Sequence, residues 1–429
     1  MPRQLQIVES LLKAPGLQAV QRRLEQGGAL SGNGAVSAAH PLVSVMLREK
    51  LERPVLLIAE GVKTQENFQQ DVETWLKVIG SEEKPFFYPA WEVLPQESRL
   101  PHSDVISERL ETLAALKLGS QKAPVIVTSA TALLQKTFAP EYLEQGTRLF
   151  KRGDQMDPLD LIEWLEEQGY EPEAQVSNKG EIALRGGILD VYALTSPWPV
   201  RLEFFGNELE SLRFFDPASQ ISREEIQSVV IPPAGEIGIL KKLIESNRHA
   251  AATLFDYLPE STICVFSDFT LIEQQAQHYL EQIEELDPFF IGWEQVLEKI
   301  QEKRLTTLSL SEETVAADVQ LDLSNLDLYR PLPGRAPEPQ IAEAQRQEFF
   351  QQMQRWLRQE YSVHVFCNND GERQRFEEVW NEYGGSDILE AKSLRPETDL
   401  GSLGRGFISL EAIIVVVTYA EVFGRYKVD

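Results

Sequence analysis

Short apolar runs separated by stretches of helical periodicity constrain this sequence most. Residues 54–59 (PVLLIA), 124–128 (PVIVT) and 261–266 (STICVF) are rich in β-branched side chains and are each about as long as one strand. Runs of this kind are typical of parallel strands that are buried on both faces. Residues 64–79 follow the first run with helical spacing. The pattern therefore predicts an α/β domain with a doubly wound parallel sheet, divided into residues 1–144 and residues 231–330.

The segment between these two halves has a different pattern. Apolar and polar residues alternate strictly at 181–185, 188–192 and 200–205, which predicts half-exposed strands. The apolar positions are even in the first run and odd in the second, which predicts a β-bulge at Gly186-Gly187. Gly206-Asn207 is a signal for a two-residue hairpin turn. Residues 145–230 are therefore expected to form an inserted, mostly antiparallel α+β domain.

Prolines mark the end of the second half of the parallel-sheet domain. Pro331, Pro333, Pro337 and Pro339 cluster with Gly334 in residues 331–340, which predicts a linker. A last small α/β domain is expected at residues 341–429. Its predicted elements are helices at 341–360 and 371–383 and strands at 363–367 and 413–418.

The charge balance excludes one class of function. The 429 residues include 41 lysines and arginines against 67 aspartates and glutamates, which gives a net charge of −26. A chain this acidic is not expected to bind DNA mainly by displacing counterions from many phosphates. The acid excess either serves solubility or leaves DNA binding to a partner or to another part of a longer protein.

Cysteine content and hydropathy bear on location. Cys264 and Cys367 are too few for a disulfide framework or a zinc site, and both lie in apolar runs, where buried thiols are expected. The sequence contains no run of about eighteen apolar residues, so no membrane span is predicted. The first residues lack the pattern of a secretory signal. We therefore expect a cytoplasmic protein with no metal site and no membrane contact.

Residues 29–36 (ALSGNGAV) have the glycine-rich composition of a phosphate-binding loop. A working loop needs a lysine for the β- and γ-phosphates and a hydroxyl side chain for magnesium. Ala35 and Val36 occupy those two positions here, and Ala29 stands at the first glycine position, ahead of Gly32 and Gly34. A plain glycine-rich turn is the alternative. The segment is interpreted as a degenerate phosphate loop.

The expected second half of such a site has its own defect. An apolar strand should end in Asp-Glu, but the candidate at residues 265–269 ends in Asp268-Phe269. Asp268 is better explained as the N-cap of the helix that follows it. Two independent defects argue against ATP hydrolysis, so no catalytic residue and no cofactor is assigned to this chain.

Alternate side chains of the strand at 200–205 divide into two faces. The apolar face consists of Val200, Leu202 and Phe204, and the other face consists of Arg201, Glu203 and Phe205. Arg185, on a neighbouring strand, can join the second face. Exposed arginine and aromatic side chains have the composition of a protein-binding hot spot. A solvated face with one incidental phenylalanine is the alternative.

Several longer motifs resemble one family. They are LRGGILDVY at 184–192, PVRLEFFGNELESLR at 199–213, FDP at 215–217, PAWEVLP at 89–95, PHSDVISER at 101–109, LFDYLP at 254–259, GRGF at 404–407 and EVFGR at 421–425. Together they resemble the UvrB-homology module of the bacterial transcription-repair coupling factors (Mfd), and the resemblance extends over essentially the whole chain. UvrB itself, an ATP-dependent helicase subunit of excision repair, is the alternative, but it keeps a functional phosphate loop.

The resemblance implies a non-catalytic, UvrB-like scaffold that recruits the damage-recognition ATPase UvrA. Matching positions place the UvrA contacts at Arg185, Arg201, Glu203 and Phe205. It also implies that the chain is an N-terminal fragment ending at Asp429. RNA polymerase and duplex DNA would then be bound by later domains, which would also hold ATP and magnesium for a DNA translocase.

Overall fold

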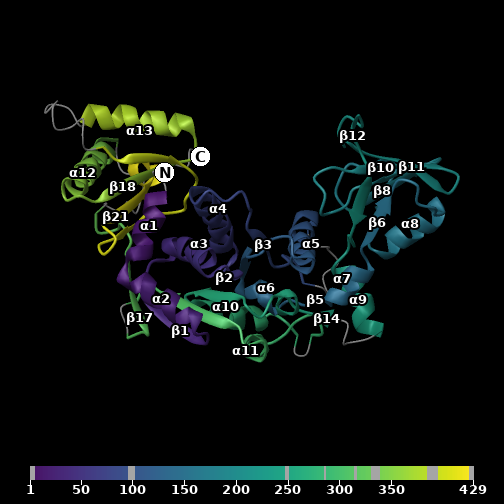
Figure 1. Ribbon diagram of the computed structural model, residues 1–429, viewed down its shortest axis with the longest axis horizontal. Coiled ribbons are helices and arrows are strands. Elements are labelled where there is room, and N and C mark those ends of the chain that lie inside the picture. Colours follow the sequence, from purple (N-terminus) through teal and green to yellow (C-terminus); the bar gives the residue numbers. More distant parts are fainter. Residues whose placement is uncertain are drawn as a thin grey trace.

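A seven-stranded sheet forms the centre of the molecule (Figure 1). The computed structural model describes residues 5–94, 102–246, 251–284, 287–313, 316–329, 339–383 and 395–424. The strands run in the order β17-β1-β16-β15-β2-β4-β3, and every neighbouring pair is parallel. They span Ala29–Ala35 (β1), Val55–Ala59 (β2), Phe86–Tyr88 (β3), Val125–Ser129 (β4), Ile263–Ser267 (β15), Thr306–Ser311 (β16) and Val319–Leu323 (β17). The predicted doubly wound parallel sheet is confirmed.

Helices cover both faces of this sheet, because alternate strand residues point to opposite sides. Leu57 and Val265 face one apolar core, whereas Leu56 and Phe266 face the other. The first core is covered by α1 (Leu5–Lys13), α2 (Pro15–Glu25), α3 (His40–Leu51) and α4 (Val62–Val78). The second is covered by α5 (Ser103–Leu118), α6 (Ala130–Leu134), α10 (Phe269–Leu280) and α11 (Trp293–Glu302). Burial on both faces explains why the central strands contain almost no charge.

The glycine-rich segment is a strand and not a loop, so the predicted phosphate loop is wrong in its backbone. Ala29, Gly32, Gly34 and Ala35 lie in β1, which pairs with β16 on one side and β17 on the other. Val36 follows the strand, and its amide N–H donates to the carbonyl of Leu323. A Cβ atom at Gly34 would lie 2.3 Å from the carbonyl oxygen of Leu321. The glycines therefore permit close strand pairing instead of leaving amides open to phosphate.

A second sheet forms the arm on the right of Figure 1. Its strands run in the order β12-β11-β10-β9-β8-β7, all antiparallel except the β7–β8 pair. They span Glu171–Pro172 (β7), Glu181–Arg185 (β8), Ile188–Val191 (β9), Val200–Phe205 (β10), Glu208–Phe215 (β11) and Ser222–Ile226 (β12). The mostly antiparallel architecture expected for this segment is confirmed.

Short elements connect this arm to the central sheet. Strands β6 (Arg148–Lys151) and β13 (Ser228–Ile231) form a two-stranded ribbon. Helix α8 (Pro158–Glu167) contributes Leu161 and Leu165 to the core beneath the six-stranded sheet. Around the junction lie β5 (Thr137–Phe138), α7 (Pro140–Gln145), α9 (Ile237–Ser246) and β14 (Ala251–Ala252).

The predicted bulge at Gly186-Gly187 is wrong. Ile182 pairs with Val191 and Leu184 with Leu189, in one continuous register across a two-residue turn. In a hairpin with a two-residue turn, paired residues lie on the same face, and each even-numbered residue pairs with an odd-numbered one, as Ile182 does with Val191. Even positions of one strand therefore face the same side as odd positions of the next. Register shifts in this sheet lie between β10 and β11 and between β11 and β12. The first is next to the predicted Gly206-Asn207 turn, which is confirmed by the pairing of Phe205 with Glu208.

A four-stranded sheet in the order β19-β18-β21-β20 forms the other arm. Its elements are α12 (Pro339–Arg358), β18 (Ser362–Cys367), α13 (Asp370–Tyr383), β19 (Glu397–Leu400), β20 (Phe407–Ser409), β21 (Ile414–Thr418) and α14 (Tyr419–Phe423). The four elements predicted for this part are confirmed. Most of the predicted linker at 331–340 lies outside the described residues. Among the helices that the structure describes, none is long and apolar enough to cross a membrane.

The small sheet is fixed to the central domain through α4. The Trp75 ring meets Phe366 and Phe407, with centroids 5.3 and 6.3 Å away. The Gly404 amide donates to the Asp71 carboxylate over 2.8 Å, and the predicted family motif at 404–407 therefore lies in this contact. The two arms stand at opposite ends of the central sheet (Figure 1).

Candidate functional site

The predicted binding residues share one side of the six-stranded sheet, which we call the outer face. The cross-strand pairs Arg201–Asp190 and Glu203–Ile188 place β9 and β10 in register, and Arg185 lies opposite Ile188. The other side of β10 is the core face, because Val200 and Leu202 are buried there. The structure thus brings Arg185, Arg201, Glu203 and Phe205 onto one surface.

The two arginines, Arg185 and Arg201, share a buried carboxylate. The Arg201 Nε and Nη2 atoms donate to the two Asp190 carboxylate oxygens over 2.7 and 2.8 Å, and Arg185 Nη2 donates to Oδ2 over 3.4 Å. The exposed side-chain fractions are 16% for Arg201, 52% for Arg185 and 1% for Asp190. The hydrogen bonds to Asp190 hold the pKa of Arg201 above its ordinary value. Arg201 is therefore not the freely exposed side chain that alternation predicted.

A thin apolar layer lies beneath the Arg201 guanidinium. Its central carbon stands 4.5 Å from the centroid of the Phe215 ring, and Phe215 packs in a small buried cluster with Val176 and Ala183. This arrangement holds the guanidinium plane on an aromatic face. The outer face is consequently a built surface and not a simple solvated one.

The remaining two predicted residues have different settings. The Glu203 carboxylate accepts hydrogen bonds from Arg213 Nη2 over 2.7 Å and from the Ser211 hydroxyl over 2.6 Å. Phe205 stands beside the hairpin turn and is 75% exposed, while the neighbouring Ile188 is 37% exposed. Phe205 is therefore the most available apolar anchor of the outer face, and Glu203 is held in a fixed position.

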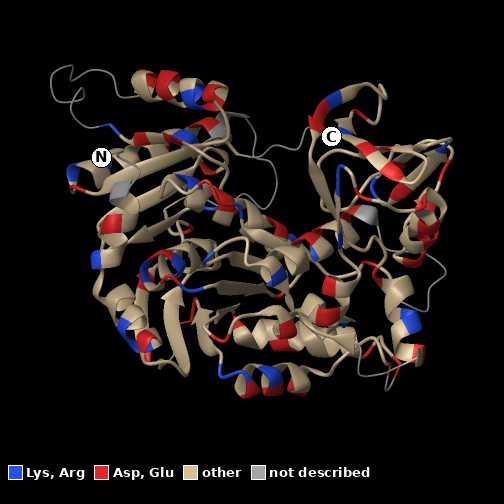
Figure 2. Ribbon diagram, turned by 45° about the vertical axis from the view of Figure 1, so that its right-hand side comes forward, with Lys and Arg blue, Asp and Glu red and all other residues tan. Residues whose placement is uncertain are grey.

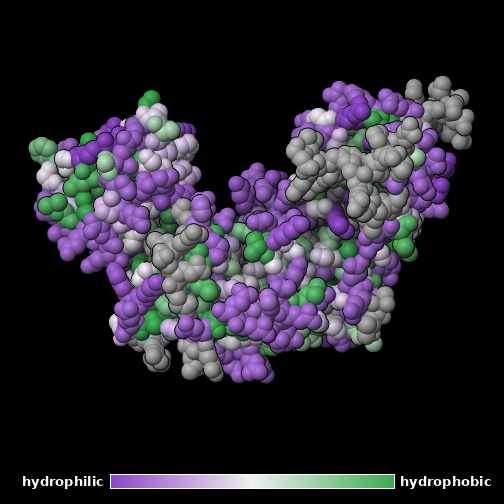
Figure 3. Space-filling model, turned by 180° about the vertical axis from the view of Figure 1, so that it is seen from behind, coloured by the Kyte–Doolittle hydropathy of each residue, from purple (hydrophilic) through white to green (hydrophobic). Residues whose placement is uncertain are grey.

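Charge and hydropathy both support a binding role for this arm. Residues 145–230 include 16 acidic and 8 basic residues, and Figure 2 shows residues of both signs along this arm. The view from behind in Figure 3 shows hydrophobic residues among hydrophilic ones on the same arm. Apolar anchors beside mixed charge are typical of protein-binding surfaces.

The carboxyl edge of β1, where a phosphate loop would lead into a helix, is filled by His40. This residue begins α3 and is 1% exposed. Its Nε2 atom lies 2.9 Å from the Ala35 carbonyl oxygen, and its Nδ1 atom lies 2.8 Å from the Ser267 hydroxyl oxygen. A carbonyl can only accept, so Nε2 carries the proton and Nδ1 accepts from Ser267. Burial lowers the pKa of His40 to about 4, so the imidazole is neutral.

Two other residues at that edge also have structural roles. Pro41 occupies the first turn of α3 and has no amide proton to offer a phosphate. The Asp268 carboxylate accepts from the Leu271 amide at the start of α10, over 3.1 Å, which confirms the predicted N-cap. Sequence patterns missed His40, although a histidine next to a proline at a helix start is a visible signal.

A buried ion-pair network includes residues of two of the motifs that carry the family resemblance, at 89–95 and 101–109. Arg109 Nε and Nη2 donate to the two carboxylate oxygens of Glu236 over 2.8 and 2.9 Å, and both side chains are fully buried. Trp91 Nε1 donates to the same carboxylate over 3.0 Å, and the Tyr88 ring lies against the guanidinium. These residues join α5 to the segment before α9, and their role is structural.

The comparisons with known proteins agree with this geometry. Residues 149–236 match the family model of the UvrB interaction domain, which encloses all of the outer face. The chain is similar to proteins named transcription-repair-coupling factor from Haemophilus influenzae (31% identical, over 45% of this chain and 20% of the relative) and Escherichia coli (31%, over 47% and 17%). A relative of the same name from Bacillus subtilis is 29% identical, over 48% of this chain and 17% of its own length. The resemblance drawn from the sequence is confirmed over about half of the chain, not over the whole of it, and the chain spans no more than a fifth of the length of these relatives.

Proposed function

We propose that this chain is a UvrB-like adaptor that recruits UvrA during transcription-coupled nucleotide excision repair. The observation that carries the proposal is the outer face, which lies inside the segment that matches the UvrB interaction domain. The names of the similar proteins support a place in the coupling of transcription to repair.

The chemistry of the outer face suits a protein partner. Phe205 offers an exposed ring at the end of the sheet, and large aromatic anchors dominate binding energy at such surfaces. Arg185 is half exposed and makes one long contact with Asp190, so most of its donors are available for a partner carboxylate. Arg201 donates two hydrogen bonds to Asp190, so its main role is to position that shared carboxylate.

Nucleotide chemistry is not part of the proposed role of this chain. His40 occupies the edge of β1, and no lysine lies in the segment of residues 29–39 that leads into α3. This arrangement supports a scaffold without ATP hydrolysis, in place of the alternative, a helicase subunit of the UvrB type.

The similar proteins are about five times longer than the matched segment, so the rest of the activity belongs to other domains. We infer that those domains supply an ATP-driven DNA translocase, with its ATP and magnesium, that displaces stalled RNA polymerase. RNA polymerase and duplex DNA would be contacted there, and UvrA here. The cell compartment that follows from this role is the cytoplasm.

The direct test is a titration of the chain with UvrA. We expect Phe205→Ala and Arg185→Ala to weaken binding, and Leu159→Ala to leave it unchanged. Leu159 is the matched control because it is an exposed apolar residue of the same arm, 67% exposed, on α8 instead of the outer face. Wild-type affinity in both outer-face variants would remove the site from the proposal.

A further inference from the structure

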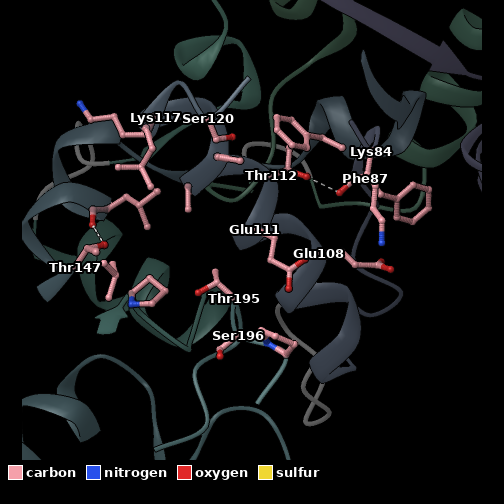
Figure 4. Close-up of a pocket in the computed structure, with 18 of the residues that line it drawn as sticks. Lys84, Phe87, Glu108, Glu111, Thr112, Lys117, Ser120, Thr147, Thr195 and Ser196 are labelled. Atoms are coloured by element: carbon pink, nitrogen blue, oxygen red, sulfur yellow. Dashed lines mark hydrogen bonds between the residues drawn. The ribbon is translucent and has the colours of Figure 1, made fainter. Parts of the chain in front are cut away.

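A groove of about 1090 Å³ separates α5 from the arm that carries the outer face. Its walls are α5 and the residues before and within β3 on one side, and the β6–β13 ribbon with residues 195–197 on the other. Figure 4 shows Glu108 and Glu111 projecting from α5 into this space, across from Thr195 and Ser196. None of the outer-face residues lines it.

Exposed apolar side chains follow the wall of the groove. Leu149 and Val230 are a directly opposed pair of the ribbon, and they are 50% and 47% exposed. Leu118, at the end of α5, is 75% exposed and lines the same space. Adjoining apolar residues left open between two structural units are typical of a binding surface.

A glutamate without a direct ion-pair partner lies on the same wall. Within the described part of the chain, the half-buried Glu108 carboxylate has no hydrogen bond and no salt bridge. Lys179 is engaged by Glu111 and by the Leu194 carbonyl, over 3.3 and 2.9 Å, and Lys117 by Glu144 over 3.1 Å. Burial, and then the nearby charges of Glu111 and Asp104, raise the pKa of Glu108 to about 7, although the charge of Lys179 opposes this shift.

The other lysine of the groove does not meet this need. Lys84 lines the same space but is exposed, so water solvates its ammonium group. Glu108 therefore has the charge of Lys179 nearby but no cation in direct contact, although its carboxylate has lost part of its water. A partner that brings a cation would supply the missing contact.

We propose that this groove binds a short peptide segment of a partner protein that presents a lysine or arginine beside a large apolar side chain. The volume lies just above the range of small-molecule sites, about 300–1,000 Å³, which favours a peptide. The cation meets Glu108, and the apolar side chain covers Leu149 and Val230. The acidic net charge of the chain raises the local concentration of such basic segments.

The test uses a labelled amphipathic peptide of leucine and lysine, measured by fluorescence anisotropy. We expect Glu108→Gln to weaken its binding about tenfold, the size of one charge-assisted hydrogen bond. Glu298→Gln is the control because it removes the same charge from an exposed site on α11. Leu149→Ser should also weaken binding, whereas Leu159→Ser, at an exposed site outside the groove, should not.

Three outcomes would overturn the proposal. Equal losses in Glu108→Gln and Glu298→Gln would show attraction to the net charge alone. Unchanged binding in both Glu108→Gln and Leu149→Ser would place the peptide elsewhere. Self-association of the chain that Leu149→Ser abolishes, seen by sedimentation, would assign the groove to a second copy. UvrA affinity measured on the same variants should stay at the wild-type value, so that failure here is separable from failure of the outer face.

Discussion

The outer face and the carboxyl edge of β1 use polar side chains in opposite ways. On the outer face, the buried Asp190 carboxylate binds Arg201 and Arg185. The Phe205 side chain lies on the same face and is 75% exposed. At the edge of β1, His40 turns inward and satisfies both ring nitrogens within the protein. A polar group that retains donors facing solvent can recognise a partner, whereas one that satisfies itself inside can only stabilise the fold.

The largest effect should come from the core face that lies directly behind the outer face. We expect Leu202→Ala to lower the free energy of unfolding by roughly 2–5 kcal/mol, because a fully buried side chain leaves a cavity. Denaturant titration measures this. UvrA affinity of the folded protein should be unchanged. Loss of affinity without loss of stability would mean that the two faces have been exchanged.

The pH dependence of stability should separate the β1 edge from the outer face. The pKa of His40 is about 4 in the folded chain, against 6.5 for an ordinary histidine. Between these two pH values, His40 therefore binds a proton in the unfolded chain but not in the folded chain. The stabilising contribution is complete above about pH 6.5 and is lost as the pH falls toward 4.

The measurement is the unfolding free energy of the wild type and of His40→Gln between these two pH values. Each pKa unit is worth about 1.4 kcal/mol, so the difference between the two proteins should shrink by about 2–3 kcal/mol as the pH falls. Other titrating groups, including Glu108, are common to both proteins and cancel in the comparison. Parallel curves would mean that His40 is accessible to protons in the folded state.

The exposed ring on the outer face should show the reverse behaviour of a core residue. Phe205→Ala is expected to cost about 2 kcal/mol of UvrA affinity, the usual threshold of a hot spot. Its unfolding free energy should change by less than about 0.5 kcal/mol, because the ring is solvent-exposed. Calorimetric titration beside thermal melting gives both quantities. An early melting transition would show that the ring packs within the sheet.

The two arginines should divide into a positioning residue and a contact residue. Arg201→Ala leaves the buried Asp190 carboxylate without its main partner and should cost about 1–3 kcal/mol of stability. Arg185→Ala leaves the Asp190–Arg201 pair intact and should cost less than about 0.5 kcal/mol of stability, while it weakens UvrA binding. Equal effects of the two substitutions on stability would contradict this division.

Much of this architecture could be predicted from local patterns. Short buried runs such as the one at 54–59 predict parallel strands well, because burial on both faces leaves a simple signature. The error at residues 29–36 has a physical cause. Glycines permit both open loops and close strand pairing, and only the position of Leu321 against Gly34 decides between them.

The sequence predicted which face of β10 carries the candidate site, but it did not predict the contacts that its side chains make. Alternation along β10 placed Arg201, Glu203 and Phe205 on one side, which the structure bears out geometrically. The engagement of Arg201 depends on Asp190, a residue on another strand, and strand register is set by turns that alternation alone does not specify.

The smallest expected effect is the response to nucleotide, and it tests the β1 edge most directly. A ligand that binds only the folded chain raises its stability according to its concentration relative to the dissociation constant. His40 fills the position, Pro41 offers no amide proton, and Asp268 is engaged as a helix cap. We therefore expect ATP with magnesium to shift the melting temperature of this chain by less than about 1 °C, measured against magnesium alone. A clear saturable shift, or magnesium-dependent phosphate release, would favour a helicase subunit of the UvrB type. Loss of that shift in His40→Gln would locate the nucleotide at this edge, and its persistence would locate it elsewhere.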